Sequence, residues 1–226
     1  MSPQQFLRQV PLFQSLTQQD SERLAACLKR QILKKGEVLF RKGSEGTALY
    51  IIVKGTVKIA LPSRLGDEVI LAIFSEGDFL GEMALLDGMP RSADVAALEP
   101  SEVLILDRSD FLSFLKNNKN AIRSILSTLS MRLRKTDDFL EDTCFLKISA
   151  RLAKKLVELA GTYGRQEQGS ILIDLRLAQT DLASMVGATR ESVNKELRVL
   201  REKGLVSITS NGIVIHDVER LKRRIH

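Results

Sequence analysis

The sequence predicts an α+β fold: a β-rich first half, a long helix, and a winged helix-turn-helix at the carboxyl end. Three observations support this prediction. Short runs of alternating apolar residues, separated by glycines, fill residues 31–106. From 122 to 140 the chain then repeats a spacing of three or four residues whose positions are apolar except Thr136. Two short helical patterns joined by a glycine turn follow at 180–197, and an Asn-Gly pair comes soon after them.

In the first half, apolar residues alternate with other residues at a period of two, which is the pattern of half-buried strands. Glycines between the runs allow backbone conformations that other residues resist. Many short strands with regular turns imply a sandwich, a barrel or a jelly roll. The alternating runs are Val38/Phe40, Leu49/Ile51/Val53, Val57/Ile59/Leu61, Val69/Leu71/Ile73 and Val103/Ile105.

Composition argues against a metalloenzyme. A metal-binding jelly roll needs several imidazoles, but both histidines, His216 and His226, lie at the carboxyl end. An iron–sulfur cluster takes about four cysteines, and the chain has only Cys27 and Cys144. The sequence also shows no nucleophile–base pair and no phosphate-binding P-loop. We therefore expect no enzyme activity and no metal, haem or iron–sulfur cofactor.

Charge is distributed unevenly along the chain. Residues 1–150 carry 20 lysines and arginines against 19 acidic residues, whereas residues 151–226 carry 14 against 9. A basic excess in the last third is expected of a surface that contacts DNA phosphates. Two distant cysteines suit a reducing cytoplasm, and no apolar run approaches the roughly 18–20 residues of a membrane span. We expect a cytoplasmic protein without a membrane partner.

The stretch 79–93 reads FLGEMALLDGMPRSA and carries a distinctive set of polar groups. Arg91 offers a planar fork of donors suited to an anion, and Ser92 adds a hydroxyl. Backbone amides around Ala84 could hold the same oxygens, while Glu82 could accept from a hydroxyl. Either Glu82 or Arg91 alone would be explained by a surface ion pair. The ordered set indicates a site for a small anion with a neighbouring hydroxyl.

This stretch resembles the phosphate-binding cassette of cyclic-nucleotide-binding domains, and the similarity extends over about 11–108. The resemblance implies a jelly roll and a nucleotide effector, with cyclic AMP expected. It implies that Gly81 and Glu82 meet the ribose and that Arg91 and Ser92 meet the phosphate. The expected effector-binding residues are Gly81, Glu82, Met83, Ala84, Arg91, Ser92, Thr136 and Asp137.

A long helix is predicted from about Ala121 to Asp142. A strip that packs on the β-rich half would explain its apolar spacing as well as a coiled-coil seam would. The polar Thr136 favours a seam between two chains, because a polar seam residue is costly without a partner. We therefore expect a homodimer. The seam positions, spaced 4, 3, 4, 3 and 4 residues apart, are Ile122, Leu126, Leu129, Leu133, Thr136 and Leu140.

Caps are predicted for the shorter helices. Ser109-Asp110 would cap a helix from Phe111 to Lys116. Ser149 would cap another from Ala150 to Ala160, which Gly161 would close. These helix ends are predicted from residue type alone.

The stretch 180–197 reads as helix, turn and helix, with Thr180 and Thr189 as the expected caps. A plain helical hairpin with a solvated face would show the same pattern. The apolar runs on both sides of Ser210-Asn211-Gly212 instead indicate a β-hairpin, and a helix-turn-helix followed by a hairpin is a winged helix. Its polar face would enter the major groove. The expected DNA-binding residues are Thr180, Thr189, Arg190, Glu191, Ser192, Asn194 and Lys195.

The span from Phe145 to about Glu219 resembles the DNA-binding domain of the Crp/Fnr family, with Gly187 at the turn. Arg190 can contact guanine and Glu191 cytosine. The resemblance implies a homodimeric transcription regulator that binds palindromic double-stranded DNA with TGTGA-like half-sites and contacts RNA polymerase. Lys195 stands where cyclic-AMP-binding members have a second arginine.

The resemblance also implies that the residue pair at 136 and 137 contacts the nucleotide base. Members that bind cyclic AMP carry Thr-Ser there, whereas this chain has Thr136-Asp137. A carboxylate accepts but does not donate hydrogen bonds, so a different nucleotide effector, or none, is the alternative. A regulatory subunit of a partner enzyme is a second alternative, which the helix-turn-helix argues against. The expected divisions are a sensor domain at 1–118, a dimerisation helix at 119–145 and a DNA-binding domain at 146–226.

Overall fold

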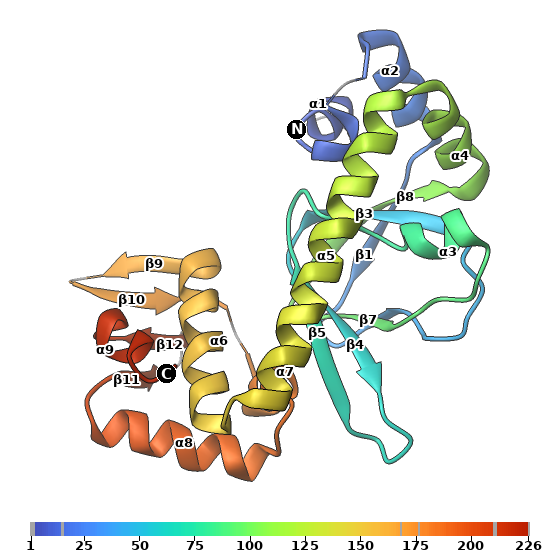
Figure 1. The fold of residues 1–226 in the computed structure, drawn as a ribbon. Coiled ribbons are helices and arrows are strands. Elements are labelled where there is room, and N and C mark those ends of the chain that lie inside the picture. Colours follow the sequence, from blue (N-terminus) through green and yellow to red (C-terminus); the bar gives the residue numbers. More distant parts are fainter. Residues whose placement is uncertain (1–2, 15, 168, 176, 210–211, 226) are drawn as a thin grey trace. The chain divides into compact units, whose positions relative to one another are not determined.

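The computed structural model describes residues 3–14, 16–167, 169–175, 177–209 and 212–225. The chain divides into two compact units (Figure 1). The first unit contains 1–62 and 71–135, and the second contains 63–70 and 136–226.

The first unit is built around two four-stranded antiparallel sheets, which confirms the predicted jelly roll. One sheet has the strand order β1-β8-β3-β6 and the other has the order β2-β7-β4-β5. The elements before the long helix, of which only β5 extends by residues 68–70 into the second unit, are α1 (Pro3–Leu7), η1 (Pro11–Phe13), α2 (Gln18–Cys27), β1 (Lys29–Leu33), β2 (Val38–Phe40), β3 (Ala48–Lys54), β4 (Val57–Pro62), β5 (Glu68–Phe74), β6 (Phe79–Leu80), α3 (Glu82–Asp87), β7 (Asp94–Ala97), β8 (Ser101–Asp107) and α4 (Arg108–Asn117).

The core of this unit has two apolar clusters that share strand β3. One cluster lies within the roll and includes Ile52, Val57 and Val95. The other lies where the sheet containing β3 meets the helices, and it includes Ile51 and Phe111. Ile51 and Ile52 are both fully buried, because successive side chains of a strand point to opposite faces. Strand β3 is therefore covered on both faces.

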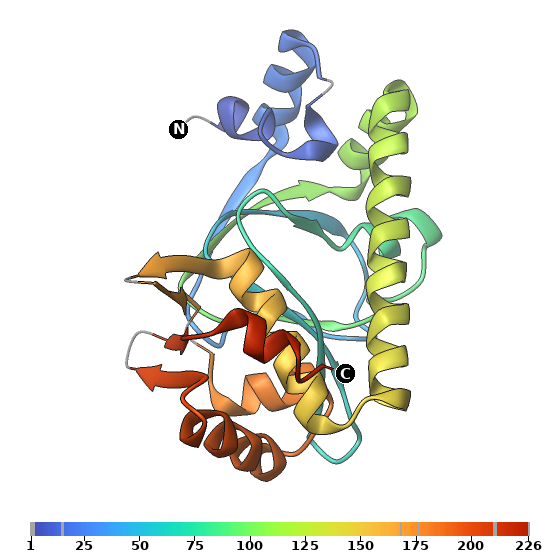
Figure 2. The same cartoon turned by 60° about the vertical axis from the view of Figure 1, so that its left-hand side comes forward.

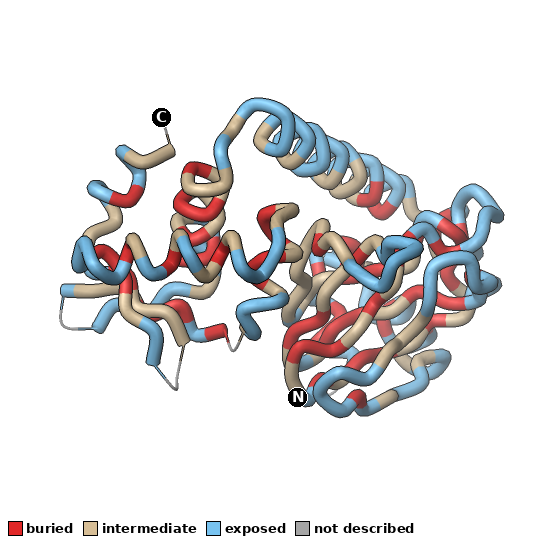
Figure 3. Tube along the Cα trace, turned by 90° about the horizontal axis from the view of Figure 1, so that it is seen from below, coloured by how far each residue is buried: buried red, intermediate tan, exposed pale blue. Residues whose placement is uncertain are grey.

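Helix α5 (Lys119–Phe145) is one uninterrupted helix of 27 residues (Figure 2). Among the described residues only Ala121 and Ile125 of this helix are buried, so most of its length is coloured as exposed or intermediate in Figure 3. Four of the five apolar seam residues are exposed: Ile122 by 43%, and Leu126, Leu133 and Leu140 by 60–63%. The fifth, Leu129, packs partly against the core of the first unit.

The second unit combines helices with a four-stranded antiparallel sheet of strand order β11-β12-β10-β9. Helices α7 and α8 form the helix-turn-helix, and strands β11 and β12 pair as the wing. The hairpin residues Ser210 and Asn211 lie outside the described residues. The elements after α5 are α6 (Ile148–Tyr163), β9 (Gly164–Glu167), β10 (Ser170–Ile173), α7 (Gln179–Val186), α8 (Arg190–Glu202), β11 (Val206–Thr209), β12 (Gly212–Ile215) and α9 (Val218–Lys222).

Several predicted helix boundaries are wrong. Helix α4 follows Asp107 rather than Asp110, and α6 follows Lys147 rather than Ser149. Gly161 lies inside α6 instead of closing it. Thr180 lies within α7, which Asp181 stabilises by accepting a hydrogen bond from the backbone N–H of Ala178 at 2.9 Å. Residue types that favour caps therefore located each helix but missed its first residue by a few positions.

Candidate functional site

The cassette predicted at 79–93 folds as strand β6, the short helix α3 and a loop that leads into β7. Gly81 joins the strand to the helix with φ of +87° and Gly88 ends the helix with φ of +73°. Both angles lie in the left-handed region, which favours glycine. A Cβ on Gly81 would also lie 2.5 Å from Nη1 of Arg91. Glycine at position 81 therefore lets the arginine come against the backbone.

Arg91 is held inside the first unit, with only 3% of its surface exposed. Its Nη1 donates to the carbonyl of Gly81 and its Nη2 donates to the carbonyl of Ala48, each at 2.7 Å. The guanidinium carbon lies 4.3 Å from the ring centroid of Phe40 and 5.5 Å from that of Tyr50, which are cation–π distances. Burial lowers the pKa of Arg91. This arginine is therefore part of the scaffold and is not a solvated surface charge.

Glu82 is also buried, with 2% of its surface exposed, and it is paired with a residue that the sequence analysis missed. Nη1 of Arg132 donates to Oε1 of Glu82 at 2.6 Å, and Nη2 of Arg132 donates to the carbonyl of Phe79. The guanidinium carbon of Arg132 also lies 4.4 Å from the ring centroid of Phe74. One signal could have indicated it: Arg132 lies four residues before Thr136 and thus on the same face of α5.

Two polar atoms of the cassette are buried without a hydrogen-bond partner among the described residues. They are Oε2 of Glu82 and Nε of Arg91. Buried polar atoms are nearly always paired, so an unpaired acceptor and an unpaired donor in one cassette fit a ligand that has both a hydroxyl and an anionic group. Ser92 is exposed, and among the described residues its Oγ makes only a long contact of 3.8 Å with Sδ of Met83.

The remaining cassette residues, Met83 and Ala84, differ in how far they are buried. Ala84 is buried, and a Cβ added to Gly46 would lie 2.3 Å from its Cβ, so the backbone is closely packed there. Met83 is 46% exposed. The structure thus brings Gly81, Glu82 and Arg91 into contact and leaves the hydroxyl of Ser92 available at the surface.

Thr136 and Asp137 belong to the second unit, and both are exposed on α5. Their contact with a nucleotide base therefore stays a prediction.

The recognition helix α8 begins as the sequence predicts. Oγ1 of Thr189 accepts from the backbone N–H of Ser192 at 3.2 Å, and Gly187 forms the left-handed turn before it with φ of +61°. Arg190, Glu191 and Lys195 are exposed on this helix.

Two other predicted DNA-binding residues are less available. Oγ of Ser192 lies 2.9 Å from Oγ1 of Thr189, so this hydroxyl takes part in the cap. Oδ1 of Asn194 is buried and has no hydrogen-bond partner in the described chain. The face that α8 offers to solvent near its first turn is therefore carried mainly by Arg190, Glu191 and Lys195.

No group of three or more metal-binding side chains occurs among the described residues. In the part of the chain that the structure describes, no helix has both the length and the apolar character of a membrane span.

Comparison with known proteins gives two family matches. Residues 30–118 match the cyclic nucleotide-binding domain, and residues 150–224 match the Crp-like helix-turn-helix domain. The chain is 34% identical over 190 residues to the CRP-like cAMP-activated global transcriptional regulator of Mycobacterium tuberculosis, a match that covers 84% of this chain and 85% of that protein.

Solved structures show the same fold. FixK2 from Bradyrhizobium japonicum superposes with a TM-score of 0.78 at 20% identity, covering 88% of this chain and 98% of FixK2. The c-di-GMP responsive global regulator CLP of Xanthomonas campestris gives a TM-score of 0.77 at 23% identity, covering 89% of this chain and 100% of CLP.

Proposed function

Because the chain belongs to the Crp/Fnr family of DNA-binding transcription regulators, we propose that it is a homodimeric regulator whose affinity for DNA is set by cyclic AMP. The observation that supports this most strongly is the cassette, where a buried carboxylate and a buried guanidinium each keep one unpaired polar atom. We propose a cytoplasmic regulator without catalytic activity.

The residues of the cassette fit a cyclic nucleotide. Such a ligand supplies a singly charged phosphodiester and a ribose hydroxyl. Oε2 of Glu82 is an acceptor suited to that hydroxyl, while Nε of Arg91 and the hydroxyl of Ser92 are donors suited to the phosphate. Both Nη atoms of Arg91 already bind backbone carbonyls. Ligand binding therefore adds to an arginine that the fold holds in place.

We propose that α5 carries the dimer contact. Ile122, Leu126, Leu133 and Leu140 expose large apolar surfaces at the spacing of a coiled-coil seam. We propose that residues 1–118 sense the effector, 119–145 form the dimerisation helix, and 146–226 bind DNA. A nucleotide that contacts Thr136 and Asp137 would favour one arrangement of the paired helices, and its effect equals its difference in affinity for the two arrangements.

For the DNA-binding end, we propose that α8 enters the major groove with its amino-terminal turn. Arg190 can bind guanine through two hydrogen bonds, and Glu191 can accept from cytosine. A homodimer with two such helices would bind a palindromic site with TGTGA-like half-sites. RNA polymerase is the expected protein partner. Thr180, Ser192 and Asn194 would have supporting roles at this interface.

A different effector is the second candidate. Asp137 favours it, because its carboxylate cannot donate a hydrogen bond to adenine. The fold neighbour CLP is described as responsive to c-di-GMP, so this fold accommodates regulators with other nucleotides. A regulatory subunit of a partner enzyme is less well supported, because that role makes no use of the exposed face of α8.

The DNA-binding proposal is tested with the variant Arg190→Ala. Fluorescence anisotropy would measure its affinity for a palindromic TGTGA duplex and for a scrambled duplex, each with cyclic AMP present. Loss of the guanine contact should cost about 1–3 kcal/mol on the TGTGA duplex and much less on the scrambled duplex. An equal loss on both would show that Arg190 contacts only phosphate.

A further inference from the structure

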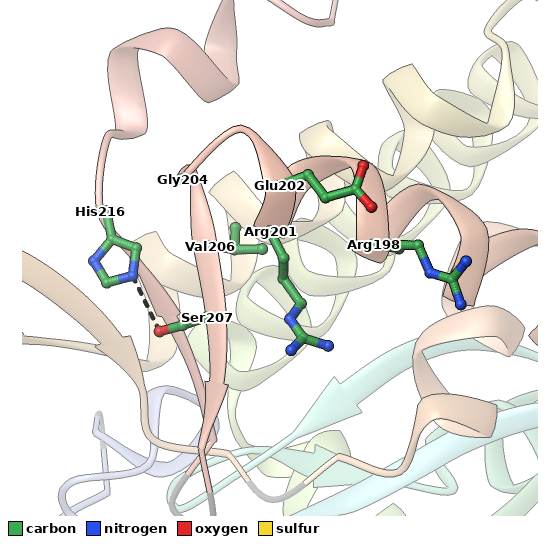
Figure 4. Close-up of a pocket in the computed structure, with 7 residues that line it drawn as sticks. All are labelled: Arg198, Arg201, Glu202, Gly204, Val206, Ser207 and His216. Atoms are coloured by element: carbon green, nitrogen blue, oxygen red, sulfur yellow. Dashed lines mark hydrogen bonds between the residues drawn. The ribbon is translucent and has the colours of Figure 1, made fainter.

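A shallow hollow of about 610 Å³ lies in the second unit, between the end of the recognition helix α8 and the wing (Figure 4). Its chemistry differs from that of the cassette, because cationic and hydroxyl side chains dominate its lining. One lining residue, Glu202, is acidic. The residues that line it are Arg198, Arg201, Glu202, Gly204, Val206, Ser207 and His216.

The two arginines of this hollow have no anionic partner in the described chain. Arg198 and Arg201 are both exposed, and no ion pair or hydrogen bond of their side chains occurs among the described residues. By contrast, Lys154, Lys155 and Lys222 of the same unit each bind a carboxylate at 2.5–2.7 Å. Like charges three residues apart on a helix disfavour each other, so this pair is suited to an external anion.

The arginine side chains extend to the same side of α8 in Figure 4, and the carboxylate of Glu202 does not accompany them. Glu202 lies four residues after Arg198, yet no ion pair joins them within the described part of the chain. The acidic residue of the lining therefore leaves both guanidinium groups available to a ligand.

The opposite wall of the hollow is fixed by His216. Its Nε2 lies 3.0 Å from Oγ of Ser207, and its Nδ1 lies 3.2 Å from Oγ of Ser170. Ser170 begins β10, Ser207 belongs to β11 and His216 follows β12. One ring thus ties three strands of the wing sheet together, which places a hydroxyl and an imidazole beside the two arginines.

The position of the hollow along α8 indicates its ligand. At about 1.5 Å per residue, Arg198 lies about 12 Å beyond Arg190 along the helix axis, and Arg201 lies about 16 Å beyond it. The major groove is about 12 Å wide, so a helix that places Arg190 against the bases brings the hollow to the backbone that borders the groove. We propose that the hollow binds a backbone phosphodiester of DNA through Arg198 and Arg201, with Ser207 and His216 as the supporting wall.

This inference rests on the proposed DNA-binding function, and it predicts a sequence-independent contact. The test compares the whole chain with the variant Arg198→Gln/Arg201→Gln, with cyclic AMP present. Anisotropy would give the affinity for the palindromic TGTGA duplex and for a scrambled duplex over a range of salt concentrations. Each lost phosphate contact lowers the slope of log affinity against log salt by about 0.9. Because one phosphodiester contact is lost, we expect the magnitude of the slope to fall by about 0.9 on both duplexes, while the ratio of the two affinities stays the same.

The matched control is Lys155→Gln/Lys222→Gln, which removes the same charge from two lysines outside the hollow. It should leave the slope unchanged, and circular dichroism would confirm that both variants are folded. If Arg198→Gln/Arg201→Gln keeps the original slope, or if the control lowers it equally, the phosphate site is overturned. If the unaltered chain fails to distinguish the two duplexes, the proposed function fails instead, whatever the slopes show.

Discussion

At the scale of single residues, the cassette depends on a glycine that lets an arginine approach the backbone. Nη1 of Arg91 donates to the carbonyl of Gly81 itself, and a Cβ at position 81 would lie 2.5 Å from that nitrogen. The same residue has φ of +87°. Both the backbone angle and the close approach therefore require glycine at this position.

Gly81→Ala should therefore destabilise the first unit more than an alanine at an open glycine. Gly77 is the matched control, because its φ is +86° and nothing lies within 4 Å of an added Cβ. Each variant should carry a backbone strain of about 1–3 kcal/mol, and Gly81→Ala should cost about 1–3 kcal/mol more from overpacking. Scanning calorimetry would measure the stability loss of Gly81→Ala and of Gly77→Ala. Equal losses would contradict the packing described for Arg91.

At the same scale, the carboxyl of Asp78 makes the stability of the fold depend on pH. Burial raises the pKa of its carboxyl above the ordinary value of 3.8, although the N–H of Ser75 and the charges of Arg132 and Lys135 act to lower it. A raised pKa means that the folded chain holds this proton more tightly than the unfolded chain. The stability that this proton contributes is complete below about pH 3.8 and is lost as the pH rises through the folded pKa.

Asp78→Asn removes this titration and keeps an acceptor for the N–H of Ser75. We expect the unfolding free energy of the variant, relative to the unaltered chain, to rise between pH 3.8 and neutrality. Denaturant unfolding at a series of pH values would measure it. A difference that stays constant over that range would show that burial does not shift this carboxyl.

At the scale of elements, alternation of apolar residues located most strands but missed β1, β6, β7 and β9. Strand β6 has only two residues, and β7 has Val95 as its one large apolar residue, so neither shows a clear period of two. Strand β9 is exposed along its whole length, and strand β1 buries only Leu33, so neither alternates between apolar and polar residues. The helix-turn-helix was easier to predict, because Gly187 marks its turn and Thr189 marks the start of α8.

The observed caps of α7 and α8 predict how two threonine variants differ in stability. Thr189 accepts from the N–H of Ser192, whereas Thr180 lies inside α7. Thr189→Ala should lower the stability of the second unit by about 1 kcal/mol, and Thr180→Ala should leave it almost unchanged. Calorimetry would measure the stability of both variants. A larger loss for Thr180→Ala than for Thr189→Ala would show that Thr180 is the capping residue after all.

At the scale of the whole molecule, the resemblance to cyclic-nucleotide-binding domains implied the jelly roll, whereas the order of a β-rich half, a long helix and a winged helix-turn-helix followed from periodicity and turn residues. The pairing of Glu82 with Arg132 did not, because the two residues are 50 positions apart in the sequence. Nor did the inward orientation of Arg91, which depends on carbonyls of Gly81 and Ala48. Sequence patterns gave the residue types of the cassette, while contacts between distant elements determined how its charges are satisfied.

The central claim is that a nucleotide at the cassette controls DNA affinity. Its most direct test is the affinity of the chain for the palindromic TGTGA duplex, measured by anisotropy during a titration with cyclic AMP. The affinity should rise and reach a plateau, and Ser92→Ala, which removes an exposed hydroxyl, should need more cyclic AMP to reach it. An affinity that is the same at every cyclic AMP concentration would contradict the claim.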